Sequence, residues 1–186
     1  MEKLIFKNGM PGNLLELEIP GERIMLRAVS DKYVDIMFRE FDSEITKYMF
    51  PSPNEDIGQA QTFIDKSRKE MAAGHTLTFS FIDKDTGEFL GNGGLHTNSS
   101  PASTPELGLW IKKSAHGNKY GREAIHTLCN WARANLEFDY LIYPVARDNI
   151  ASRKIPESLG GVIFKEEITQ KANGEDMDTV VYKIDC

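Results

Sequence analysis

The segment 111–124 holds the residues best suited to bind an anion. It has the pattern of a strand end, a loop with two glycines and a helix start. The first backbone N–H groups of a helix lack partners within the helix and carry partial positive charge. Glycine lets the backbone approach a pyrophosphate without an intervening Cβ atom. We therefore predict an anion-binding loop made of Gly117, Asn118, Lys119, Tyr120, Gly121 and Arg122.

Two glycines before a helix also occur in ordinary tight turns, and on these residues alone that alternative stays open. The segment lacks the closing Gly-Lys-Ser/Thr of a nucleotide-binding P-loop and the three spaced glycines of a dinucleotide-binding motif. We predict no metal site, because the four histidines have no ligand spacing with cysteines or acids.

The elements that must position this loop begin with a predicted hairpin, strands 14–19 and 23–29 around Pro20-Gly21. A helix is expected behind Ser30, which is suited to cap it. The remaining expected elements are a helix over 54–73, strands 76–83, 88–96 and 106–111, a helix over 118–136, a strand 141–146, a helix over 150–159 and two final strands.

An antiparallel meander followed by a strand-helix-strand-helix-strand succession predicts an α+β, mixed-sheet fold with its parallel portion in the second half. Ligands of such sheets favour the strand ends near the crossovers. The predicted site therefore lies between residues 106 and 160.

Composition narrows the class of protein. The 186 residues suit one domain, 1–186, and the formal net charge of −6 argues against a nucleic-acid partner. The two cysteines, Cys129 and Cys186, predict no disulfide framework. With no apparent targeting segment and no apolar stretch long enough for a bilayer, we expect a cytoplasmic protein with no membrane partner.

The loop resembles the coenzyme A pyrophosphate loop of GNAT acetyltransferases, whose pattern is Arg/Gln-x-x-Gly-x-Gly/Ala at a helix start. His116 takes the Arg/Gln place, Lys119 stands at the first glycine and Gly121 matches the last position. Gly117 matches a glycine common in the ribosomal-protein N-acetyltransferase, or RimJ/RimL-like, branch.

The similarity extends along nearly the whole chain. Residues 24–27 resemble the first-strand Leu-Arg signature of that branch, and residues 87–91 its Gly-x-Leu/Ile-Gly strand. Residues 106–111 resemble its Glu-x-Gly-Tyr-Trp-Leu strand, and residues 149–154 with 159–161 its Asn-x-x-Ser-x-Arg and Leu-Gly-Phe motifs.

This resemblance implies a GNAT fold, a central mixed but mostly antiparallel sheet flanked by helices, with strand 106–111 splayed from strand 141–146. The backbone of Leu109, Trp110 and Ile111 would pair with the pantetheine arm, as an added strand would. The Asn149 amide would lie nearby. The implied cosubstrate is acetyl-coenzyme A, and the acceptor is an amine on a protein N-terminus or a small molecule.

Two positions depart from the family pattern. Lys119 adds a side chain beside the pyrophosphate, although its ammonium could pair with phosphate oxygens. Pro156 replaces the tyrosine that many members use to protonate the departing thiolate, and proline is expected to kink or shorten its helix. In the RimJ/RimL-like branch the substitute acid is the serine that corresponds to Ser152, which could equally be a helix-surface serine.

The candidate bases are Glu106, at the start of the strand facing the thioester, and His96, whose ordinary pKa lies near neutrality. Each could instead be an ordinary surface, ion-paired or core residue. A strand N–H of Trp110 or Ile111 would meet the developing oxyanion. The alternative function is a GNAT-fold protein that binds coenzyme A without turnover, and both monomer and homodimer are compatible with the sequence.

Overall fold

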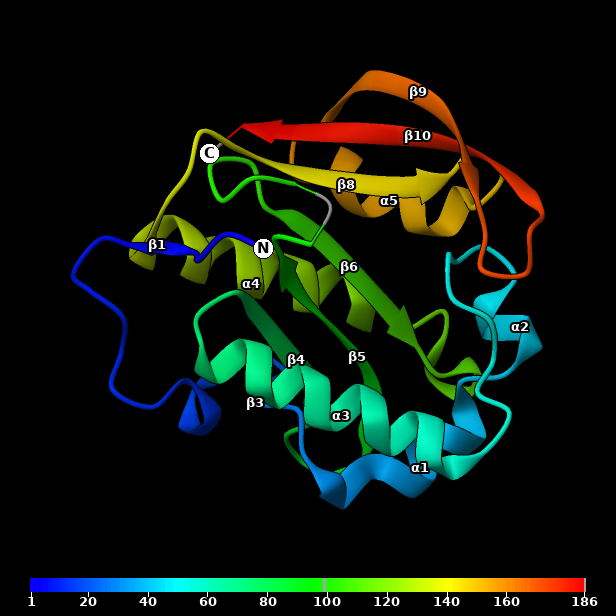
Figure 1. Cartoon of the computed structure of the whole chain (residues 1–186), viewed down its shortest axis with the longest axis horizontal. Coiled ribbons are helices and arrows are strands. Elements are labelled where there is room, and N and C mark those ends of the chain that lie inside the picture. Colours follow the sequence, from blue (N-terminus) through cyan, green and yellow to red (C-terminus); the bar gives the residue numbers. More distant parts are fainter. Residues whose placement is uncertain (99, 186) are drawn as a thin grey trace.

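A computed structural model describes residues 1–98 and 100–185 (Figure 1). Ser99 and Cys186 lie outside the described residues. An eight-stranded sheet runs in the order β2-β3-β4-β5-β6-β8-β10-β9, and β1 pairs with β7 in a separate two-stranded sheet. Every strand pairing is antiparallel except β6–β8. The predicted α+β architecture with a mostly antiparallel sheet is confirmed, and its parallel part is this one pairing.

The N-terminal hairpin is shorter than predicted. β2 (Glu18–Pro20) pairs with β3 (Ile24–Ala28), but Leu14–Glu16 form a 3-10 turn instead of the start of a strand. The Asn13 side chain accepts the Leu15 N–H (3.0 Å) and so stabilises this turn. β1 (Ile5–Phe6), which was not predicted, precedes it.

The first helical region contains more elements than predicted. Ser30 begins a 3-10 turn, Asp31–Tyr33, without a side-chain cap, and α1 (Val34–Glu40) and the unpredicted α2 (Ser43–Thr46) follow. α3 (Ile57–Ala72) starts later than residue 54, because Asp56 is the residue that caps it by accepting the Gln59 N–H.

The meander is confirmed. β4 (Thr76–Asp83), β5 (Phe89–His96) and β6 (Glu106–Ile111) pair in sequence with the predicted bounds to within one residue. A 3-10 turn, Lys113–Ala115, then leads from β6 towards the next helix.

The helices and strands in the second half of the chain follow the predicted order, but some of them begin or end at other residues than predicted. It consists of α4 (Tyr120–Asn135), β7 (Leu136–Glu137), β8 (Tyr140–Ala146), α5 (Ile150–Glu157), β9 (Val162–Gln170) and β10 (Asp176–Asp185). α4 begins two residues after the expected start. α5 keeps Pro156 inside the helix and ends two residues early because Gly160 is left-handed (φ +77°), with the Gly160 N–H bonded to the Glu157 carbonyl (3.1 Å) and the Gly161 N–H to the Pro156 carbonyl (2.9 Å).

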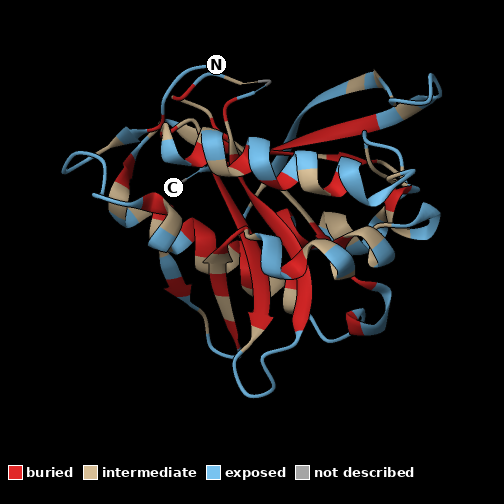
Figure 2. Cartoon of the chain, turned by 60° about the horizontal axis from the view of Figure 1, so that its bottom comes forward, coloured by how far each residue is buried: buried red, intermediate tan, exposed pale blue. Residues whose placement is uncertain are grey.

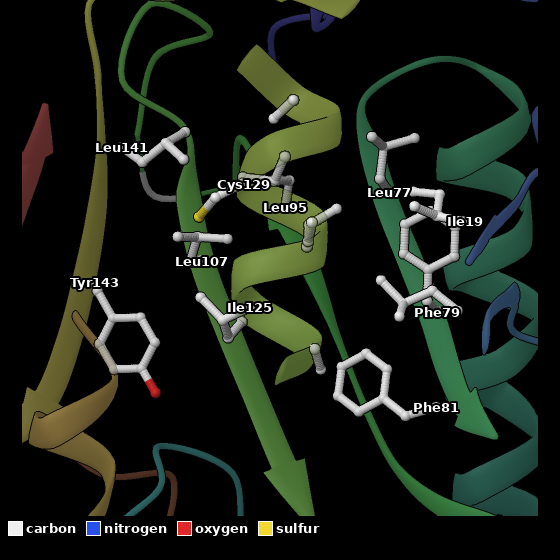
Figure 3. Close-up of a cluster of buried hydrophobic side chains, with 14 of the residues drawn as sticks. Ile19, Leu77, Phe79, Phe81, Leu95, Leu107, Ile125, Cys129, Leu141 and Tyr143 are labelled. Carbon is white, nitrogen blue, oxygen red and sulfur yellow. The ribbon is translucent and has the colours of Figure 1, made fainter. Parts of the chain in front are cut away.

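Helices cover the two faces of the sheet differently. α4 lies on one face, where its Ile125 and Cys129 pack against Phe81, Leu107 and other side chains of the main core (Figure 3). α1 and α3 lie on the other face, over a second cluster that includes Ile64, Phe89 and Trp110. β6 therefore has a packed helix on each side.

The sheet divides between β6 and β8. Their register consists of one pair, Glu106 with Ile142, whereas β6 pairs with β5 over its whole length. The predicted splay of these two strands is thus present (Figure 1). Within the described residues, no helix has the length and apolar character that a membrane span requires.

Candidate functional site

The loop from β6 to α4 contains two residues in the left-handed backbone region. Gly117 has φ +80°, and Lys119, the N-cap of α4, has φ +63°. Among residues 1–98 and 100–185, Lys119 is the one non-glycine residue with positive φ. Glycine adopts this conformation at no steric cost, which explains why the family pattern has glycine at this position.

The N-terminus of α4 carries no side-chain cap within the described chain. α2, α3 and α5 are capped by Asp42, Asp56 and Asn149, but Lys119 offers no acceptor to the first turn of α4. The first N–H groups of this helix are therefore available to an anion in the loop.

Glu123 would repel such an anion, but its carboxylate is directed elsewhere. It accepts the backbone N–H groups of Arg23 (2.6 Å) and Ile24 (3.1 Å) and pairs with the Arg23 guanidinium (2.8 Å). The same guanidinium donates to the Asn118 carbonyl (3.1 Å). The β2–β3 turn thus neutralises the acid and fixes the loop, a role for Arg23 that sequence reasoning missed.

Three predicted loop residues hold the loop in shape. His116 Nε2 donates to the Ile111 carbonyl (2.7 Å), and Asn118 Nδ2 donates to the His116 carbonyl (3.2 Å). The Tyr120 ring lies under the Arg23 guanidinium, and its hydroxyl donates to Asp83 (3.2 Å). Lys119 is exposed and Arg122 half-buried.

Gly121 is a packing residue. A Cβ atom there would lie 2.9 Å from Leu109 Cδ1, 3.3 Å from Ile111 Cγ1 and 3.5 Å from Ile155 Cδ1. Its absence lets α4, β6 and α5 meet at one point. This glycine thus brings the start of α4 next to the splayed end of β6.

The backbone of β6 faces the splay at alternate residues. The Lys112 N–H donates to the Leu90 carbonyl (2.9 Å), so the alternation of an antiparallel ladder directs the backbone groups of Leu109 and Ile111 away from β5. By the same alternation the Trp110 N–H faces β5, and its indole packs against Phe41 and Phe89. Ile111 is therefore better placed than Trp110 to offer an N–H to a ligand in the splay.

The two candidate bases lie side by side. His96 and Glu106 are directly paired residues of β5 and β6, at the end where β6 meets β8. Burial lowers the pKa of His96 to about 4, because desolvation disfavours the imidazolium. At pH 7 His96 is consequently neutral and a weaker base than an ordinary histidine.

Ser152 has a partner that sequence reasoning missed. Its Oγ lies 2.8 Å from the hydroxyl of Tyr143, a buried residue of β8, and its N–H donates to Asn149 Oδ1 (3.2 Å). Burial raises the pKa of Tyr143, so this phenol keeps its proton. The signal available in the sequence was the parity of β8, which directs Leu141, Tyr143 and Val145 to one buried face.

Residues 23–162 match the family model described as the acetyltransferase (GNAT) domain. The chain belongs to the GNAT acetyltransferase family. Its membership confirms the predicted family and enzyme class. The uncapped start of α4 and the splay of β6 from β8 are where the resemblance places coenzyme A.

Similar proteins agree with this membership. An uncharacterized N-acetyltransferase p20 of Bacillus licheniformis is 26% identical over 167 residues, which are 88% of this chain and 93% of that protein. A GCN5-related N-acetyltransferase from Brucella melitensis has the same fold, with a TM-score of 0.78 at 16% identity over 98% of this chain and 82% of the other.

A structure of the ribosomal-protein α-N-acetyltransferase RimL in complex with coenzyme A also shares the GNAT fold. Its TM-score is 0.76 at 14% identity, over 90% of this chain and 97% of RimL. At this identity the similarity shows that the two chains share a fold. In the described part of the chain, no group of three His, Cys, Asp or Glu side chains could hold a metal ion.

The first prediction concerns Lys119. Because its left-handed backbone strains any residue with a Cβ atom, Lys119→Gly should stabilise the unliganded protein by about 1 kcal/mol, or about 2–4 °C in Tm. Lys119→Val should lower the Tm, since β-branched residues tolerate this region least. Thermal unfolding measures both. Lys69→Gly, a lysine within α3, is the matched control and should destabilise by about 1 kcal/mol; a loss of similar size in Lys119→Gly would contradict the prediction.

The second prediction concerns the pH dependence that His96 causes. The folded-state pKa of about 4 lies below the ordinary value, so the unfolded state binds the proton first as the pH falls. The contribution of His96 to the free energy of unfolding is complete above about pH 6.5. As the pH falls towards about 4, this contribution is lost by up to about 1.4 kcal/mol per pH unit. Denaturant unfolding of the wild type and of His96→Asn at several pH values measures this. Only the wild type should show the additional fall in the free energy of unfolding between about pH 6.5 and about pH 4. An NMR titration of the ring with a midpoint near the ordinary pKa would refute it.

Proposed function

We propose that residues 1–186 form one N-acetyltransferase domain that moves an acetyl group from acetyl-coenzyme A to a primary amine by direct attack. The observation that carries the proposal is the juxtaposition of three features. These are the uncapped start of α4, the splay between β6 and β8, and the hydroxyl pair of Ser152 and Tyr143 beside that splay.

The residues present fit coenzyme A. The N–H groups at the start of α4 would bind the pyrophosphate, and the Lys119 ammonium lies on the exposed side of the same loop. The backbone of Leu109 and Ile111 would pair with the amide groups of the pantetheine arm. The Asn149 side chain, whose oxygen caps α5, would offer its amide N–H groups on the opposite side.

The step requires a neutral amine. A lysine amine of pKa ~10.4 must lose a proton at pH 7 at a cost of about 4.6 kcal/mol, whereas an α-amino group of pKa ~7.7–8.0 costs about 1–1.4 kcal/mol. We infer that Glu106 takes this proton, with the neutral His96 as its neighbour. The cheaper deprotonation favours an α-amino group as acceptor, and RimL, which acetylates such a group according to its name, has the same fold.

The nitrogen then attacks the thioester carbonyl, the carbon–sulfur bond breaks, and the departing thiolate takes a proton. We assign that proton to the Ser152 hydroxyl, which receives in exchange the second proton that the nitrogen loses as it becomes an amide, so the serine ends neutral. Either hydroxyl of this pair could donate; in our assignment the Tyr143 phenol, held protonated by burial, is the donor to Ser152 Oγ, which directs the serine proton away from Tyr143. Tyr143 is thus a positioning residue, and this pair takes the place of the tyrosine that Pro156 replaces.

A pocket of about 180 Å³ lies at the end of β8, and we assign the acceptor to it. It lies between Lys47 and Tyr48, which follow α2, and the β9–β10 hairpin. Asp148, Asp176 and Asp178 line it together with Lys47 and Lys171. Because Asp178 already pairs with Arg147 (2.7 Å), Asp148 and Asp176 are the acids that would attract a cationic acceptor.

A second candidate function is coenzyme A binding without turnover. Lys119 and Pro156 favour it, because each replaces a residue that the family pattern uses for the cofactor loop or the acid. The two functions share the cofactor site and differ only in whether the thioester is consumed.

The third prediction tests the cofactor site. Acetyl-coenzyme A at about 100 times its Kd should stabilise the fold by about 2.7 kcal/mol, measured as a thermal shift. Gly121→Leu should lose most of that shift, because the side chain would enter the space between Leu109, Ile111 and Ile155. Gly12→Leu, at a glycine with open space around it, is the matched control. Lys119→Glu, which leaves the packing intact, should weaken the shift by charge alone.

The outcomes separate the two functions. A shift accompanied by thiol release with an α-amino peptide supports the transferase. A saturable shift without thiol release over a panel of peptides, lysine and polyamines supports binding without turnover. The absence of a thermal shift at high ligand concentration would contradict both proposed functions.

The fourth prediction tests the hydroxyl pair by a double-mutant cycle on kcat. Ser152→Ala should lower kcat by about 10²-fold. Tyr143→Phe should lower it by about tenfold in the wild type and have no further effect in the Ser152→Ala background, because its role acts through Ser152. Tyr182→Phe is the matched control, since the Tyr182 hydroxyl bonds to Arg153 and Glu157 of the same helix. Equal effects of Tyr143→Phe in both backgrounds would show a merely structural role.

A further inference from the structure

β9 is the least covered strand of the sheet. It ends the strand order, and its outer edge pairs with no strand in the described chain. Of its nine residues, all except Glu167 and Thr169 are exposed. Figure 2 shows this exposure in the outer ribbon of the hairpin, next to the buried part of β10.

The exposed edge is long and partly apolar. Val162, Ile163, Phe164 and Ile168 are 58%, 38%, 49% and 65% exposed. The opposite edge of the sheet, β2, is only three residues long and ends in Pro20, which has no N–H to offer. β9 contains neither proline nor glycine, so its unpaired backbone can accept another strand.

We infer that β9 pairs antiparallel with β9 of a second copy of this chain, about a two-fold axis at Glu166, to form a homodimer with a continuous sheet. The charges of the strand support this occupant. In this register Lys165 of each copy lies opposite Glu167 of the other, so the same ion pair forms twice.

The two charged side chains lie on one face of the strand. Lys165 and Glu167 pair with Val181 and Thr179, two residues apart on β10, and within one chain their charged groups lie 2.5 Å apart. Moving the axis by one residue would place Lys165 opposite Lys165, or Glu167 opposite Glu167. The charge pattern therefore favours one register.

The remaining residues of the edge are compatible with this register. Glu166 meets its own copy at the axis, but its carboxylate already pairs with Arg147 (2.6 Å), which moderates the repulsion. The exposed Phe164 of one copy comes opposite the exposed Ile168 of the other. Apolar side chains thus flank the charged centre at both ends of the strand pair.

The test is the solution mass of the full chain over a range of concentrations, measured by sedimentation equilibrium. The wild type should approach twice the 21.0 kDa mass of one chain. Lys165→Glu and Glu167→Lys should each raise the dimer Kd by about tenfold, because like charges then face each other twice. The double variant Lys165→Glu/Glu167→Lys should restore the wild-type Kd.

Two controls keep the result specific. Lys69→Glu makes the same charge change on α3 and should leave the Kd unchanged. Amide hydrogen exchange of the peptide 162–170 should slow as the protein concentration rises. A wild type that stays monomeric, or a dimer that ignores both single charge reversals, would overturn the proposal, and the latter result would locate the interface elsewhere.

Discussion

The site depends on the loss of pairing between β6 and β8 after a single residue pair. Each strand is fully paired on its other side, β6 with β5 and β8 with β10, so the splay leaves backbone groups of Leu109 and Ile111 without strand partners. The Ile111 carbonyl accepts from His116 Nε2 (2.7 Å) instead. Backbone groups shielded from water need hydrogen-bond partners, and this half-buried edge therefore suits a ligand that carries amides of its own. The helix packing on both faces of β6 keeps the strand in place while one edge stays unpaired.

A second constraint acts at the end of β6. The chain must turn within a few residues from the strand into α4, and it does so through the left-handed residues Gly117 and Lys119. This turn leaves the first N–H groups of α4 uncapped, and the absent Cβ of Gly121 allows the helix to approach β6 and α5 closely. Backbone strain at Lys119 is thus coupled to the geometry of the proposed anion site.

Much of the fold and of the candidate site could be predicted from the sequence, because the patterns that specify them lie within short segments of the chain. The alternation of the meander strands and the glycine-bearing helix start are short-range patterns, and they placed β4, β6 and the loop correctly. The 3-10 turn at Leu14–Glu16 was missed because one Asn13 side-chain bond outweighed a strand-like composition. Tyr143 and Arg23 were missed because their roles depend on contacts with Ser152 and Glu123, which only the fold brings near.

α5 has eight residues with Pro156 among them, and so short a helix has little stability of its own. Side-chain bonds from two neighbouring strands fix it instead. Tyr143 of β8 bonds to Ser152, and Tyr182 of β10 accepts from Arg153 (3.0 Å) and donates to Glu157 (2.6 Å). The Gly161 N–H then bonds to the Pro156 carbonyl (2.9 Å) and closes the helix end. These bonds hold α5 against β8 and β10, and Ser152 lies between them. The helix therefore lacks the family tyrosine but holds the Ser152 hydroxyl in a fixed position.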